Sequence, residues 1–358
     1  MEFRLEDIFD LQMGKTPSRN NPGYWNSKDN KWISIADLSK CGKYIENTKE
    51  YLSDLAVEES GISCIPENTV VMSFKLSIGK TAITPEPMFS NEAIMSFRDK
   101  KIIEILPDYI YYMFSGKDWD EGTNKAVMGK TLNKATLSKI KVNIPNVEEQ
   151  KSVVEVLDKV SKLIANRKTE LEKLDELIKS RFIELFDGKG YPTLKWNEVF
   201  NTTTGKLDSN AMVENGEYPF FTCAKEVFRI DKYAFDQEAL LLAGNNAAGQ
   251  YDVKYYKGKF NAYQRTYVLG LKKDWSYQLF RYQLEDKLVY LQQQSLGGLT
   301  KYLTLKILGE LEFIVPPMDR QNEFATFVEQ TDKSKLVVQK ALDEAQLLFD
   351  SLMQKYFG

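Results

Sequence analysis

Two stretches, "KVNIPNVEEQKSVVEVLDKV" (residues 141–160) and "LEFIVPPMDRQNEFATFVEQ" (residues 311–330), follow the same plan. Each has a short β-like run, a proline and an acidic turn, and then enters a long segment with helical periodicity. Aligning Pro145 with Pro316 sets an offset of 171 residues, which continues without a gap to the end of both segments. The chain therefore contains an internal duplication of long period, and its two halves are expected to share a fold.

The segments that follow the two prolines carry apolar residues at heptad spacing, which is typical of a coiled coil. We predict that the seam is formed by Leu157, Ile164, Leu171, Ile178 and Leu185 in the first copy and by Val328, Val338, Leu342, Phe349, Leu352 and Tyr356 in the second. A plain dimerisation coiled coil would explain one such segment. Two copies in one chain favour antiparallel pairing within the chain at least as strongly.

A block of mixed character precedes each helical segment. In each block a β-like run, residues 69–74 or 239–244, is followed by a helix-like aromatic stretch, residues 107–114 or 276–288. We therefore predict an α+β fold in which two α/β domains form a pseudo-twofold tandem repeat with two long helices that pair as an antiparallel coiled coil. The predicted segments are a first domain at 1–146, a central helix at 147–187, a second domain at 188–316 and a C-terminal helix at 317–358.

Histidine is absent from the 358 residues. Its absence removes the commonest general base, the usual imidazole metal ligand and every Ser-His or Cys-His nucleophile arrangement. The three cysteines, Cys41, Cys64 and Cys223, lie far apart and form no CxxC pair, so neither a disulfide framework nor a zinc site is predicted. We expect no metal on this chain.

Charge and hydropathy narrow the choice of partners. The formal net charge of −3 argues mildly against a nucleic-acid binder, but most of the acidic excess lies in the two helical segments, so the domains are nearly neutral and contact with DNA is permitted. No apolar run approaches the roughly 18 residues that a membrane-spanning helix needs, and the start "MEFRLEDIFD" does not resemble a signal peptide. We expect a cytoplasmic protein that does not interact with a membrane.

Several motifs carry a family resemblance. They are "MGKTPSR" (13–19), "SFKLSIGKTAI" (73–83) with "SNEAI" (90–94), and "AGNNAAGQYDVKYYKGKFNAYQRTYVL" (243–269). The block starts also correspond, because Gly14 in "LQMGKTPSRN" aligns with Gly205 in "TTTGKLDSNA" at an offset of 191. With the proline-to-helix repeats, these motifs make essentially the whole chain resemble the DNA-specificity subunit of type I restriction-modification systems.

The resemblance implies that residues 1–146 and 188–316 are target-recognition domains, each of which reads one half of a bipartite DNA sequence. The helices would be a spacer that sets the number of unread base pairs between the half-sites. The chain would not itself be an enzyme. Two modification (methyltransferase) subunits would bind it to form the methylase, restriction translocase subunits would join for cleavage, and S-adenosylmethionine, ATP and magnesium would belong to those partners.

Reading duplex DNA requires donors for phosphates and side chains that pair with base edges, with Arg for guanine and Asn or Gln for adenine as favoured pairs. Candidates in the first block are Lys15, Thr16, Ser18, Arg19, Lys75, Ser77, Lys80, Asn91 and Lys130. Candidates in the second are Lys206, Asn245, Asn246, Gln250, Gln264, Arg265, Thr266 and Lys301. Ordinary turn chemistry and solvated surface lysines are the competing interpretation for each of them.

Two other classes of protein compete with this interpretation. An interaction scaffold, with a dimerising coiled coil and protein-binding blocks, is the alternative, and it predicts concentration-dependent self-association. An intact methyltransferase is poorly supported, because "NPGYW" (21–25) has glycine where the adenine-methyltransferase motif has its second proline, and no glycine-rich cofactor loop accompanies it. A metal-dependent nuclease would need carboxylates that converge on one ion, and the sequence shows no such spacing.

Overall fold

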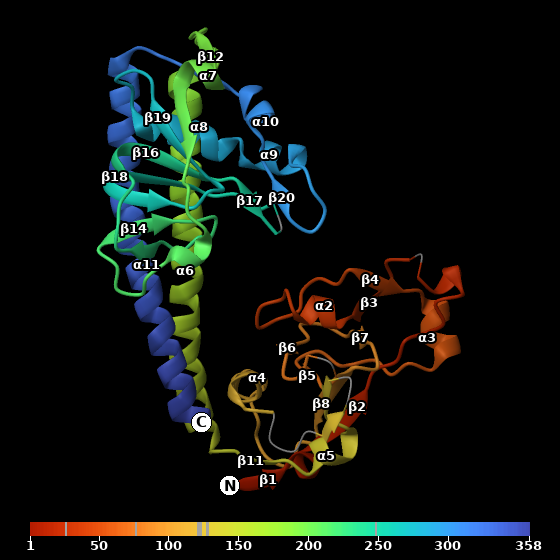
Figure 1. Ribbon diagram of the computed structural model, residues 1–358. Coiled ribbons are helices and arrows are strands. Elements are labelled where there is room, and N and C mark those ends of the chain that lie inside the picture. Colours follow the sequence, from red (N-terminus) through yellow and green to blue (C-terminus); the bar gives the residue numbers. More distant parts are fainter. Residues whose placement is uncertain (26, 76, 120–123, 127–128, 248) are drawn as a thin grey trace. The chain divides into compact units, whose positions relative to one another are not determined.

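The computed structural model describes the chain except for residues 26, 76, 120–123, 127–128 and 248, and describes only the backbone at 124–126 and 129–131. The chain divides into two compact units, which we call unit 1 (Met1–Lys168 with Lys340–Gly358) and unit 2 (Thr169–Gln339). Each unit holds one mixed helix-and-sheet block together with parts of both long helices, α6 (Val147–Phe186) and α11 (Met318–Phe357) (Figure 1).

Unit 1 contains a four-stranded antiparallel sheet, in the order β2-β8-β5-β6, and a three-stranded sheet, in the order β4-β3-β7, in which β3 and β7 run parallel. The strands of these sheets are β2 (Phe9–Met13), β8 (Ile94–Asp99), β5 (Val70–Ser73), β6 (Thr81–Ile83), β4 (Glu50–Leu52), β3 (Asn30–Ile33) and β7 (Phe89–Ser90). Two short pairs join β1 (Glu2–Arg4) to β11 (Lys141–Asn143) and β9 (Asn124–Ala126) to β10 (Gly129–Thr131). The helices are α1 (Leu5–Ile8), η1 (Pro22–Tyr24), α2 (Ile35–Leu38), α3 (Asp54–Ser60), α4 (Pro107–Gly116) and α5 (Lys134–Ser138).

Unit 2 is built on one six-stranded sheet, in the order β13-β19-β16-β18-β14-β15. Its strands are β13 (Phe200–Thr204), β19 (Thr266–Leu271), β16 (Phe235–Ala243), β18 (Val253–Ala262), β14 (Tyr218–Phe221) and β15 (Phe228–Ile230). Two short pairs join β12 (Thr193–Lys195) to β21 (Glu312–Ile314) and β17 (Asn245–Asn246) to β20 (Lys301–Tyr302). The helices are α7 (Trp196–Val199), η2 (Ser209–Ala211), α8 (Tyr277–Asp286), α9 (Leu288–Gln294) and α10 (Leu305–Gly309).

The central strands are apolar on both faces because each face of the sheet covers a different core. In β5, Val70 and Met72 pack into the cluster that includes α4, whereas Val71 packs on the opposite side with Ile33 of β3. In β16, Leu240 and Leu242 face one cluster and Leu241 faces the other. Alternate residues of a strand point to opposite faces, so a continuous apolar run is the expected sequence of a strand buried on both sides.

Both long helices begin with the same hydrogen-bonded anchor. Gln150 is fully buried; its Nε2 donates to the Pro145 carbonyl at 3.0 Å, and its Oε1 accepts from Leu106 N at 2.9 Å. In unit 2, Gln321 is 1% exposed and makes the corresponding bonds, to the Pro316 carbonyl at 2.8 Å and from Ser276 N at 3.0 Å. Each glutamine therefore ties the start of its long helix to the residue that caps α4 or α8.

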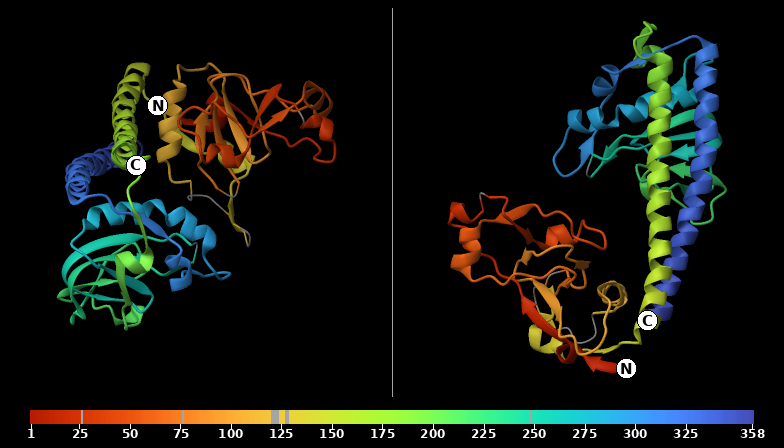
Figure 2. Two further views of the ribbon diagram at one scale, coloured as in Figure 1. Left: turned by 90° about the horizontal axis from the view of Figure 1, so that it is seen from above. Right: turned by 180° about the vertical axis from the view of Figure 1, so that it is seen from behind.

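The two long helices pair antiparallel within the chain. In unit 2, Asp175 of α6 forms an ion pair with Lys335 of α11 at 2.5 Å, and Arg181 forms one with Glu323 at 2.5 Å, so partners further along α6 lie earlier along α11. The Phe182 and Phe324 rings also lie 5.6 Å apart between these helices. The views in Figure 2 show α6 and α11 side by side. The predicted fold class, with two mixed domains and a long antiparallel helix pair, is confirmed.

The side chains at all predicted seam positions are at least partly buried. The buried ones are Leu157, Ile178, Leu185, Val328 and Val338, and the half-buried ones are Ile164, Leu171, Leu342, Phe349, Leu352 and Tyr356. The seam is not purely a helix-to-helix contact, because Phe349 also packs against Tyr112 of α4, with ring centroids 6.3 Å apart. Within the described part of the chain, no helix is both long enough and apolar enough to cross a membrane.

Candidate nucleic-acid interface

In unit 1 the chain leaves β2 through an entry loop (residues 14–19) that lies directly on a strand-end loop (residues 90–94). Gly14 N donates to the Ile94 carbonyl at 3.1 Å, and Lys15 N donates to the Ser90 carbonyl at 2.8 Å. A Cβ added at Gly14 would lie 2.2 Å from the Ser90 oxygen, which no real side chain tolerates. Glycine is therefore required here because two backbone segments touch.

Unit 2 repeats this arrangement with an entry loop at residues 205–210 and a strand-end loop at residues 262–266. Gly205 N lies 3.4 Å from the Thr266 carbonyl, and Gln264 N donates to the Leu207 carbonyl at 2.9 Å. A Cβ at Gly205 would lie 1.8 Å from the Ala262 oxygen. Gly14 and Gly205 thus occupy equivalent positions, and each brings an entry loop beside a strand-end loop.

A third segment, which we call the glycine loop, joins the same edge in both units: residues 74–80 in unit 1 and 244–250 in unit 2. Phe74 N donates to the Ala93 carbonyl at 3.0 Å, and Gly244 N donates to the Arg265 carbonyl at 2.8 Å. Each loop contains one glycine with a left-handed backbone, Gly79 at φ +87° and Gly249 at φ +68°. The two units therefore present three equivalent loops on equivalent hydrogen bonds, with different side chains attached.

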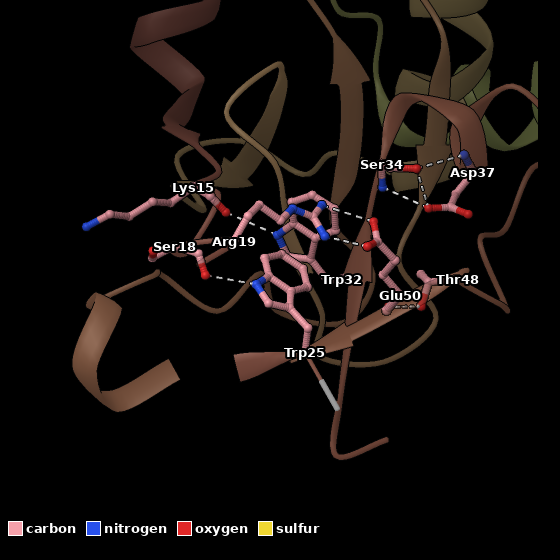
Figure 3. Close-up of polar contacts among 9 residues, drawn as sticks. All are labelled: Lys15, Ser18, Arg19, Trp25, Trp32, Ser34, Asp37, Thr48 and Glu50. Carbon is pink, nitrogen blue, oxygen red and sulfur yellow. Dashed lines mark hydrogen bonds and ion pairs between the residues drawn. The ribbon is translucent and has the colours of Figure 1, made fainter. Parts of the chain in front are cut away.

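Arg19 stands in a cluster that supports the entry loop (Figure 3). Its guanidinium donates to both carboxylate oxygens of Glu50, at 2.5 and 3.1 Å, and its Cζ lies 3.7 Å from the centre of the Trp25 ring. The indole N–H of Trp25 donates to the Ser18 carbonyl, and that of Trp32 donates to the Lys15 carbonyl, each at 3.1 Å. Two tryptophans therefore hold the backbone of the loop, and Arg19 is engaged by Glu50 rather than free for a phosphate.

The other first-block candidates divide into engaged and available side chains. Lys15 donates from Nζ to the Ser60 carbonyl at 2.6 Å, and Asn91 accepts the Ala93 N–H at 3.0 Å within its own turn. Lys75 is half-buried beside the Phe74 ring, whereas Ser77 and Lys80 are exposed. Among the described residues, the Lys80 ammonium has no hydrogen-bond or ion-pair partner. Lys80 is therefore the available cation of this glycine loop.

The lysines next to β10 and β20 were predicted to grip phosphate. Lys130 belongs to β10, where the structure describes only the backbone, so the position of its ammonium group lies outside the described part of the chain. Lys301 of β20 is half-buried, and its aliphatic stem would contact a Cβ placed at Gly249. The Lys301 stem thus covers the left-handed turn of the glycine loop.

The second block offers more available groups. Within the described part of unit 2, the side chains of Lys206, Gln250 and Arg265 are exposed and make neither a hydrogen bond nor an ion pair. Gln264 is also exposed, and its Nε2 lies 3.4 Å from an Asp208 oxygen, a long and weak contact. Gln264 and Arg265 line a hollow of about 290 Å³.

Three further candidates of this block take part in local structure. Asn245 and Asn246 form the short strand β17, and the Asn246 oxygen accepts the Gln250 N–H at 3.3 Å. Thr266 is only 1% exposed, so its hydroxyl is buried in the sheet and cannot reach a duplex. Asn245 and Asn246 are half-buried at the edge of the interface.

Sequence reasoning missed Glu92, which lies in the strand-end loop of unit 1. Its carboxylate accepts a hydrogen bond from the Thr16 hydroxyl, and that bond, the hydrogen bond from its own backbone N–H and the Lys75 and Arg19 charges lower its pKa. An acidic side chain is not expected where phosphates bind, so Glu92 is not among the candidates that were chosen as hydrogen-bond donors. The signal that could have revealed it is its alignment with Gln264 once "SNEAI" is placed on "AYQRT".

The geometry describes a protein with two homologous mixed domains, each of which presents an edge of three loops, joined through paired helices. A family model, the type I restriction modification DNA specificity domain, matches the chain twice, at residues 1–176 and 189–345. The chain belongs to this family and has the role of a DNA sequence specificity subunit.

Similarity to individual proteins agrees with this assignment. The specificity subunit of the type I restriction enzyme EcoDI from Escherichia coli is 36% identical over 152 residues, 40% of this chain and 33% of that protein. The MjaIX specificity subunit from Methanocaldococcus jannaschii is 24% identical over 98% of this chain and 91% of that protein. Among solved structures, the S subunit from M. genitalium matches all of this chain and 96% of its own with a TM-score of 0.65 at 14% identity, which shows a shared fold.

Proposed function

We propose that each unit reads one half of a bipartite DNA sequence and that the paired helices α6 and α11 set the number of unread base pairs between the half-sites. The observation that carries this proposal is the repeated edge of three loops. The backbone hydrogen bonds that join the strand-end loop to its neighbours recur in the two units, whereas exposed side chains on that loop differ, as in Glu92 against Gln264. A conserved frame with different polar groups is what two readers of different base sequences require.

The chain acts without catalysing a reaction itself, as part of a larger type I complex in the cytoplasm. Two modification subunits bind it to form a methylase, and restriction subunits join that assembly for cleavage. S-adenosylmethionine, ATP and magnesium are bound by those partners. The sequence supports this division, because a chain without histidine lacks the commonest general base.

The paired helices offer a surface for the modification subunits. In unit 2, Leu336 and Val337 of α11 are 73% and 69% exposed, and in unit 1, Leu347 and Leu348 of the same helix are 70% and 49% exposed. These four side chains lie outside the predicted seam, so they are not needed for pairing with α6. Helices packing on either of these two patches would bury apolar area, and burial of apolar area is the main driving force of association.

The scaffold alternative has less support. Its coiled coil would have to self-associate through the heptad seam, but in each unit that seam is covered by the partner helix or by a helix of the mixed block. Sedimentation of the isolated chain at increasing concentration checks this point. We expect a monomer, and a stable dimer that dissociates when Leu171 is replaced by Glu would favour the scaffold.

Single-molecule sequencing of methylated adenines tests the proposed function. Cells carrying the chain with its cognate modification subunits are compared with cells lacking only the chain. We expect a bipartite methylated sequence that disappears with the chain. If the same sequence stays methylated without the chain, the proposal is wrong.

A further inference from the structure

We call the entry loop, strand-end loop and glycine loop of a unit its recognition edge. The two strand-end loops place one side chain at the same position of each recognition edge. Asn91 N donates to the Ile33 carbonyl at 3.1 Å, and Tyr263 N donates to the Phe221 carbonyl at 2.9 Å. Two residues further along each loop, the carbonyl of Ala93 or Arg265 accepts a hydrogen bond from the first N–H of the glycine loop. Glu92 and Gln264 lie between these two matched bonds, so they are equivalent in the two units.

The surroundings of Glu92 keep its carboxylate charged. The Thr16 hydroxyl donates to Oε2, and the positive charges of Lys75 and Arg19 lie near enough to lower the pKa of the group. The Glu92 backbone N–H also hydrogen-bonds to the carboxylate and lowers its pKa, and the side chain is exposed. The edge of unit 1 therefore presents an exposed, ionised acceptor among donors.

An ionised carboxylate at a DNA-binding edge cannot contact a phosphate, because the two charges repel. It can accept a hydrogen bond from the exocyclic amino group of a base, and in the major groove Glu and Asp pair with N4 of cytosine. Gln264 differs in that its amide both donates and accepts, the pattern that matches N6 and N7 of adenine. The same position thus carries two different chemistries in the two units.

We infer that Glu92 and Gln264 are equivalent base-reading residues, and that Glu92 selects a base with an exposed amino group, cytosine by preference, in the half-site read by unit 1. This inference rests on the proposed function and adds to it the identity of one specificity-determining residue. Thr16 acts as a positioning residue, since its hydroxyl holds Oε2 of a carboxylate that remains exposed.

Reciprocal substitutions test the inference in the complete methylase, formed from the full chain and its modification subunits. Glu92→Gln keeps an acceptor for the Thr16 hydroxyl and the length of the side chain while it removes the charge and adds a donor. We expect one base of one half-site to change, with a shift in preference of roughly ten- to hundred-fold. Gln264→Glu should alter one base of the other half-site.

Two measurements are made on each variant: sequencing of methylated adenines in cells, and competition for binding by the purified methylase against duplexes in which each half-site position is varied. Glu67→Gln is the matched control, because Glu67 is exposed on the turn before β5, away from the three loops, and should leave both half-sites unchanged. Thr16→Val removes the positioning hydroxyl and should weaken discrimination at the position read by Glu92 without creating a new preference.

The outcomes separate the two proposals. If the wild-type sequence depends on the chain but Glu92→Gln and Gln264→Glu leave every position unchanged, the inference is wrong and the proposed function stands. If Glu92→Gln and Thr16→Val lower methylation equally with no change in base preference, Glu92 only anchors the entry loop, and the inference is also wrong. If wild-type methylation does not depend on the chain, the proposed function itself fails.

Discussion

Single residues at the recognition edges have tasks that their chemical type does not reveal. Arg19 was predicted to contact DNA, yet its guanidinium stacks on the Trp25 ring and forms a bidentate ion pair with Glu50. Gly14 and Gly205 carry no side chain, yet they allow the entry loops to touch the strand-end loops. Much of the recognition edge therefore consists of residues that shape the loops rather than residues that contact a ligand.

Removing the Arg19 side chain should weaken DNA binding without changing its dependence on salt. A side chain that contacts a phosphate contributes about one unit to the slope of log affinity against log salt concentration. Because Arg19 is held by Glu50, we expect Arg19→Ala and Glu50→Ala to have similar effects and an unchanged slope, as measured by titration of the assembled complex. Lys80→Ala serves as the contrast, and it should lower the slope. A lower slope for Arg19→Ala alone would show that Arg19 binds phosphate.

Gly14→Ala and Gly205→Ala should each destabilise the chain by about 1–3 kcal/mol, because the new Cβ would overlap backbone atoms and force the loops apart. Denaturant unfolding measures the effect. Gly42→Ala and Gly270→Ala are matched controls, since a Cβ at either position meets nothing within 4 Å. Equal stability of the Gly14 variant and the Gly42 variant would contradict the close approach of the loops.

At the scale of the elements, each long helix is fixed to its mixed block by one buried glutamine. Each of these glutamines, Gln150 and Gln321, hydrogen-bonds to two backbone groups. One is the carbonyl of the proline before the long helix, and the other is the N–H of the residue that caps α4 or α8. A buried backbone group that loses its partner costs about 1–3 kcal/mol. The direction in which a long helix leaves its domain thus depends on these bonds.

Gln150→Leu should destabilise the chain by about 3 kcal/mol, because it leaves the Leu106 N–H and the Pro145 carbonyl without a partner in the interior. Gln346→Leu, at an exposed position of α11, is the control and should change stability little. Denaturant unfolding compares the two. Similar stability for both variants would mean that water replaces the bonds of Gln150.

Leu171→Glu and Leu342→Glu should loosen the paired helices by placing a charge in a half-buried seam, at a cost of about 1–3 kcal/mol. Leu347→Glu, at a position that is 70% exposed, should leave unfolding unchanged and instead weaken binding of the modification subunits. Unfolding curves and co-purification separate these effects. Unaltered methylation by the two seam variants would count against the spacer role.

At the scale of the whole molecule, the net charge of −3 limits what the chain can do alone. Affinity for DNA comes largely from counterion release at phosphates, and a nearly neutral surface neutralises few of them. We expect weak binding of the isolated chain and tight, specific binding after the modification subunits join, as measured by titration with a duplex that carries the methylated sequence. Tight, specific binding by the chain alone would contradict this dependence on partners.

The sequence by itself determined the duplication, the two long helices and the family. Heptad spacing and the two prolines specify the long helices, because a period of seven is a local property of the chain. The glycines at 14 and 205 likewise marked equivalent loop starts before any fold was known. The two offsets also show that the first block is longer by 20 residues, and the added length falls between Gly14 and Phe74, where unit 1 carries α2 and α3.

Only the tertiary structure decided which side chains of the loops are available. Lys15, Arg19 and Thr266 look like DNA contacts in the sequence, but residues distant in the chain, Ser60 and Glu50 among them, engage or bury them. Glu92 was missed for the converse reason, since its equivalence to Gln264 depends on matched backbone hydrogen bonds within each unit. Exposure and pairing are set by such long-range contacts, and residue type alone does not encode them.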